Sequence, residues 1–108
     1  MVLEIRDKKK EVLLILFSED LATYSMESLK NDLEEILEVV IDEFSVVLRL
    51  AGIKNISLEF LYSILSFSKS LLSIKSRLFL EVESELSIQL LDLGLGSLVY
   101  SIEEIPLD

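Results

Sequence analysis

Short apolar segments alternate with amphipathic segments along this chain, and this alternation limits the possible folds more than any other feature. Residues 11–17, 45–50 and 77–82 are nearly continuous apolar runs of strand length. We expect the first to be covered on both faces and the other two to lie in the middle of a sheet. Between these runs, 26–40 and 57–73 carry apolar residues three and four positions apart, which predicts helices. Strands that alternate with helices imply parallel crossovers, so the sequence predicts an α/β fold.

Weaker patterns predict the other elements. In chain order we expect a strand over 2–5 that forms a hairpin with the next strand, a short helix capped by Ser84 and ending near Gly94, a strand over 98–101, and a helical turn over 102–105. Arg49 interrupts its apolar strand, and we expect it to point along the strand edge toward a carboxylate. The predicted architecture is a single domain over 1–108, with a mixed four- to five-stranded sheet and about four helices.

Charge narrows the range of partners. The 20 acidic and 10 basic residues give a formal net charge of -10, which repels nucleic-acid phosphates and anionic membranes. A basic or neutral protein is the natural complement. No apolar run reaches the roughly 18 residues that a membrane helix needs, and the first residues lack the pattern of a secretory signal. We therefore expect a cytoplasmic protein without direct membrane insertion.

Composition also argues against catalysis. The chain has no His and no Cys, so it lacks the commonest general base and the soft metal ligands. Its three glycines, Gly52, Gly94 and Gly96, form no phosphate-binding loop. We expect no enzyme activity, no cofactor and no metal site.

Two segments carry a family resemblance. Residues 90–95, Leu-Leu-Asp-Leu-Gly-Leu, look like a Leu-Glu-Leu-Thr-Gly-Leu motif that closes the third helix of the STAS domain. Residues 101–105, Ser-Ile-Glu-Glu-Ile, resemble the acidic start of its last helix. The expected order of elements is also similar to that family, a small α/β module of bacterial anti-sigma-factor antagonists. The resemblance implies transcription regulation through protein–protein interaction.

The family's phosphorylation switch lies at the start of the second helix and reads roughly Asp-Ser-Ser/Thr-Gly. Here the matching residues are Ser57-Leu58-Glu59-Phe60, so Leu58 stands at the phosphoacceptor position and cannot take a phosphate. Ser57 is a possible substitute acceptor, because a phosphate is stabilised at a helix N-terminus. Alternatively, Ser57 only caps the helix.

The same helix carries a stripe of small residues. Ser63, Ser66, Ser70 and Ser73 follow spacings of three and four, so they share a face with few charges. That face suits close contact with a partner, although serine is abundant throughout the chain and the stripe could reflect composition alone. We expect the buried side of the helix to consist of Leu58, Leu61, Ile64, Leu65, Ser68, Leu71 and Leu72.

In the family, the start of this helix and its exposed face dock on a kinase. The resemblance and the serine stripe therefore predict a partner-binding surface made of Ser57, Leu58, Glu59, Tyr62, Ser63, Ser66 and Ser70. The leading hypothesis is a regulatory module that binds an anti-sigma factor or switch kinase without the usual phosphoserine. The alternative is a structural accessory subunit that docks on an ATPase or another complex through the apolar Leu58 and Phe60. Self-association into a homo-oligomer is also open.

Overall fold

The computed structural model describes residues 2–6, 10–23, 25–40, 43–94 and 101–104. Five strands lie in these ranges: β1 (Val2–Arg6), β2 (Glu11–Phe17), β3 (Ser45–Ala51), β4 (Arg77–Val82) and β5 (Ser101–Glu104). Four helices connect them: α1 (Ser18–Thr23), α2 (Met26–Val39), α3 (Leu58–Ser73) and α4 (Ser84–Asp92). The α/β class, the mixed sheet and the number of helices agree with the prediction.

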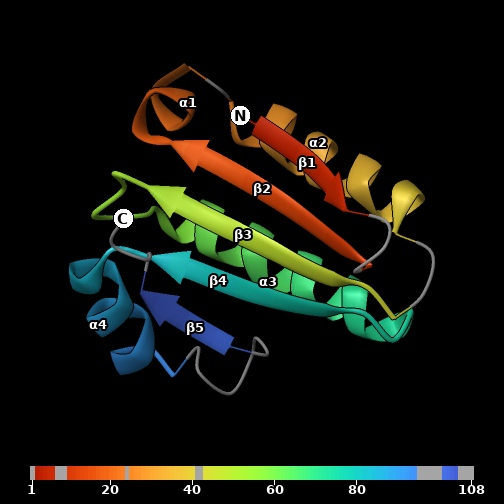
Figure 1. Cartoon of the computed structure of the whole chain (residues 1–108). Helices are drawn as coiled ribbons and strands as arrows, with labels where there is room; N and C mark the ends of the chain where they lie inside the picture. The colour runs from red at the N-terminus through yellow and green to blue at the C-terminus, as the bar shows by residue number, and fades with distance from the viewer. Residues whose placement is uncertain (1, 7–9, 24, 41–42, 95–100, 105–108) are drawn as a thin grey trace.

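The strands follow one another across the sheet in chain order (Figure 1). β1 is antiparallel to β2, and β2, β3, β4 and β5 are parallel to one another. This confirms the hairpin and places β3 in the centre. Because every parallel crossover steps in the same direction, right-handed connections put the helices on the same face.

The core lies between that face and the helices. Val46, Leu48 and Leu50 of β3 are fully buried, whereas the residues between them are only half-buried. The helices contribute to the same core cluster through Leu29 and Leu33 of α2, Phe60, Ile64, Phe67 and Leu71 of α3, and Leu86 and Leu90 of α4. A single hydrophobic layer therefore holds the three long helices on the sheet.

The other sheet face carries no helix from the described part of the chain. The expectation that residues 11–17 are covered on both faces is therefore wrong for Ile15 and Phe17, although Leu13 is buried on this face. Ile15 is half-buried and Phe17 is 39% exposed. The apolar run predicted two covered faces because apolar side chains also lie on this open face. They belong to Leu13, Val47 and Phe79.

Arg49 lies on the open face, and its expected carboxylate partner is Glu81. The two residues are paired across β3 and β4, and Arg49 Nη2 lies 3.0 Å from Glu81 Oε2. A second nitrogen, Nε, donates to the same oxygen at 3.2 Å. The bond crosses the middle of the sheet rather than following a strand edge.

The C-terminal segment differs most from the prediction. Residues 102–104 belong to β5 instead of a helical turn, because Ile102 packs against the core and Glu103 pairs with Glu81 of β4. This overturns the likeness of 101–104 to an acidic helix start. The strand expected over 98–101 shares only Ser101 with the observed β5. Residues 98–100 and Ile105 lie outside the described residues.

Two of the three long helices begin with a serine N-cap. The hydroxyls of Ser25 and Ser57 accept hydrogen bonds from the amides of Ser28 and Phe60, as N-caps do. At α4 the N-cap is Glu83, without a side-chain cap bond, so Ser84 is the first helical residue and not the cap. Gly94 has φ +82°, the left-handed conformation predicted after this helix.

Candidate functional site

The start of α3 is built by the turn that follows β3. Gly52 has φ +71°, a conformation that glycine adopts without the strain of a side chain, and it turns the chain away from the sheet. Ser57 then adopts an extended conformation, and its Oγ accepts a hydrogen bond from the Phe60 amide at 3.1 Å. The negative charge of Glu59 in the first turn interacts favourably with the helix dipole. Local chemistry thus fixes the position and direction of α3.

Two large side chains project from these first turns. Leu58 is 66% exposed and Tyr62 is 65% exposed. They are four residues apart and therefore lie one above the other on the helix surface. Ser66, also exposed, continues the same ridge one turn further. Leu58, Tyr62 and Ser66, with Glu59 beside them, form what we call the α3 ridge.

Phe60 does not belong to this surface. It is 1% exposed and is part of the hydrophobic core, so the proposed apolar interface of Leu58 and Phe60 is wrong. The expectation that Leu58 and Leu72 lie on the buried side is also wrong, because they are 66% and 59% exposed. Instead of these two leucines, Phe60 and Phe67 lie on the buried side of α3. The sequence indicates this buried side through the spacing of Phe60, Ile64, Phe67 and Leu71, which follow one another at four, three and four residues.

The serine stripe divides between two environments. Ser63, Ser66 and Ser70 line a narrow groove of about 40 Å³ against Lys30, Leu33, Glu34 and Leu37 of α2. Ser63 and Ser70 are half-buried there, and the Ser63 hydroxyl donates to the Glu59 carbonyl at 3.0 Å. Small side chains let the two helices approach each other closely. Ser63 and Ser70 therefore face α2, and only Ser66 also belongs to the α3 ridge.

Hydrogen bonds tie the loop before α3 to α4. The Gly52 amide donates to Glu83 Oε1 at 3.2 Å, and Gln89 Nε2 donates to Asn55 Oδ1 at 3.1 Å. The start of α3 and helix α4 thus lie together at the carboxyl ends of β3 and β4. Ligands of open α/β sheets bind at this end, in the crevice where the strand order reverses. The present strand order has no such reversal.

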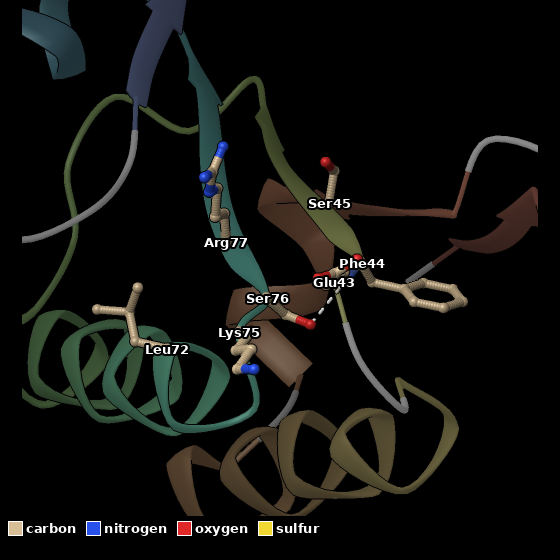
Figure 2. A pocket seen from close by; sticks show the side chains of 7 residues that line it. All are labelled: Glu43, Phe44, Ser45, Leu72, Lys75, Ser76 and Arg77. Atoms are coloured by element: carbon tan, nitrogen blue, oxygen red, sulfur yellow. Dashed lines mark hydrogen bonds between the residues drawn. The ribbon is translucent and has the colours of Figure 1, made fainter.

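A larger hollow, of about 570 Å³, opens at the opposite end of the sheet (Figure 2). It is lined by Glu43, Phe44, Ser45, Leu72, Lys75, Ser76 and Arg77. The fully buried Ser76 accepts a hydrogen bond from the Phe44 amide at 3.0 Å. The side chains of Lys75 and Arg77 extend in different directions in Figure 2, so they do not converge on one ligand. This hollow lies between the α3–β4 turn and the residues that lead into β3.

In the described ranges, no three carboxylates gather as a metal site, and none of the helices there is long and apolar enough to cross a bilayer. The Ser57 hydroxyl already serves as a helix cap. The α3 ridge offers exposed apolar area next to one carboxylate, which suits a protein partner.

No family model, curated protein or solved structure matches this chain at a significant level. The relation to the STAS family therefore stays a prediction from the sequence. Of the two segments that carried it, residues 90–94 include the end of α4, whereas 101–104 form a strand.

Proposed function

We propose that this chain is a non-enzymatic module that binds a protein partner through the α3 ridge. The observation that carries the proposal is the pair Leu58 and Tyr62, both about two-thirds exposed at the start of a helix whose inner side is firmly packed. Paired exposed apolar side chains on a rigid element are typical anchors of a protein interface. Because Ser57 fixes the helix end, the surface is held ready for binding before a partner arrives.

The partner class comes from the sequence resemblance. We propose an anti-sigma factor or switch kinase as the partner, with binding that is independent of phosphorylation and takes place in the cytoplasm. This choice is based on the element order expected from the sequence and on the motif at residues 90–95, whereas 101–104 form a strand. Because the chain has a net charge of -10, we propose that the contacting surface of the partner is neutral or basic.

Phosphorylation of Ser57 is a separate question with a direct test. The Ser57 Oγ accepts from the Phe60 amide, so a phosphate there replaces an existing cap. We expect the intact mass to stay unchanged after incubation with ATP and the captured kinase. A phosphopeptide that contains Ser57 would show that the switch has moved by one residue.

The α3 ridge is tested by the double variant Leu58→Ser/Tyr62→Ser. We expect a loss of partner capture of at least about tenfold, because the two side chains supply the apolar contact area. Since both side chains are exposed, the free energy of unfolding should change by less than about 0.5 kcal/mol. The measurement is affinity capture with the tagged chain from its own cell extract, quantified by mass spectrometry, with urea unfolding in parallel.

Leu72→Ser is the matched control, because Leu72 is a similarly exposed leucine at the other end of α3. The proposal fails if the double variant captures the same partners in the same amounts as the wild-type chain. A stoichiometric complex with an ATPase, lost in the double variant, would favour the accessory-subunit alternative. Loss of a dimer in sedimentation would indicate self-association through the same ridge.

A further inference from the structure

Helix α4 exposes apolar side chains on its outer face. Ile88 is 63% exposed and Leu91 is 54% exposed, and Leu93 directly after the helix is 62% exposed. On the inner side, Leu86, Ser87 and Leu90 are buried against the sheet. Ile88 and Leu91 are three residues apart, so they are neighbours on the helix surface. This nine-residue helix therefore carries apolar side chains on its outer side as well as on its inner side.

Acidic residues dominate the sequence after Arg77, which includes α4. The sequence contains no Lys or Arg after Arg77, whereas the same stretch carries seven acidic residues, Glu81, Glu83, Glu85, Asp92, Glu103, Glu104 and Asp108. Glu85 and Asp92 lie on α4 itself, both exposed, three residues before and four residues after Ile88. They are therefore placed one helical turn on either side of the apolar centre.

We propose that the outer face of α4 binds a basic amphipathic helix of a partner protein. The apolar stripe of such a helix covers Ile88 and Leu91, and its flanking Lys or Arg side chains meet Glu85 and Asp92. A second copy of this chain is disfavoured, because a symmetric contact through α4 would bring the same carboxylates together. The inference does not depend on the α3 ridge, which uses other residues.

The position of α4 in the fold suits this role. Gln89 is bonded to Asn55 and Glu83 to Gly52, so the helix is fixed to the loop that leads into α3. Figure 1 shows α4 at the β5 side of the molecule, on the far side of β3 from α2. A bound helix at α4 therefore leaves the groove between α2 and α3 undisturbed.

The test uses a fluorescent synthetic helix of about 18 residues, with leucines three and four positions apart and lysines elsewhere. A scrambled peptide of the same composition and a leucine–glutamate helix are its controls. We expect anisotropy to report binding of the leucine–lysine helix alone, with affinity that falls as NaCl is raised. Ile88→Ser/Leu91→Ser should weaken binding about tenfold or more, because the apolar contact is lost.

Neutralising carboxylates on α4 distinguishes peptide binding at this face from a general attraction of the basic peptide to an acidic protein. Glu85→Gln/Asp92→Asn should weaken binding by about threefold or more and flatten its salt dependence. Glu35→Gln/Glu38→Gln removes the same charge from exposed positions of α2 and should have less effect. Far-UV circular dichroism checks that every variant is folded.

The proposal is overturned if wild-type protein does not bind the leucine–lysine helix, or if Ile88→Ser/Leu91→Ser binds it unchanged. Equal losses in the α4 and α2 charge variants would also overturn it, since they would indicate nonspecific attraction. Leu58→Ser/Tyr62→Ser should leave peptide binding intact. Failure of this inference therefore remains distinguishable from failure of the α3 ridge.

Discussion

Ser57 and Ser84 occupy similar places in the sequence but different places in the structure. Ser57 is the N-cap of α3, and its hydroxyl accepts a hydrogen bond from Phe60, whereas Ser84 is the first residue inside α4. We expect Ser57→Ala to lower the free energy of unfolding by about 1 kcal/mol, because an amide at the helix start loses its partner. Urea unfolding followed by circular dichroism measures the change.

Ser84→Ala is the matched control for this prediction. It should shift the free energy of unfolding by less than about 0.5 kcal/mol, because the α4 cap position is Glu83 and makes no side-chain cap bond. Equal losses for the two variants would mean that the assignment of the caps is wrong. At the residue scale, the sequence pattern of a small polar residue before a helix was right for α3 and one residue late for α4.

At the scale of elements, the Arg49–Glu81 bond joins β3 to β4 on the sheet face that carries no helix in the described residues. The two side chains are 30% and 15% exposed, so water screens their attraction only in part. We expect Arg49→Met and Glu81→Gln each to cost about 1–2 kcal/mol of stability, because each leaves a half-buried partner unpaired. A double-mutant cycle should give a coupling of about 1 kcal/mol.

The control for the cycle is Lys69→Met, which removes an exposed charge from α3 and should be nearly neutral. Additive effects of the two sheet variants, with no coupling, would contradict the bond. Sequence alone suggested a carboxylate partner for Arg49 but could not choose one among the 20 acidic residues. The choice of Glu81 follows from the register of β3 and β4.

At the scale of the whole molecule, the net charge of -10 acts on stability as well as on partner choice. Like charges repel more strongly in the compact state, and salt screens that repulsion. We therefore expect Tm to rise by a few degrees when NaCl is raised from about 20 to about 300 mM. Differential scanning calorimetry at constant pH measures the shift. A fall in Tm would mean that attractive ion pairs dominate.

The sequence was sufficient wherever a local pattern decides the structure. Apolar runs predicted β2, β3 and β4, and apolar spacing predicted α2 and α3, because these elements bury one continuous stripe each. The apolar patterns did not predict α1. The residue that indicates the start of this helix is Asp20. The carboxylate of Asp20 accepts from the Phe17 amide at 2.8 Å, a short-range bond that starts a helix directly after β2.

Tertiary structure decided what local patterns leave open. Whether 101–104 become a helix or a strand depends on β4, which offers an unpaired edge to the C-terminal segment. Whether Leu58 or Phe60 is buried depends on the rotation of α3 against the sheet, and both are apolar enough for either place. The sequence by itself thus determined the α/β class, the main elements and the acidic surface, because these follow from composition and periodicity. Only packing decided which apolar side chains the α3 ridge and α4 present to a partner, because burial depends on neighbours distant in sequence.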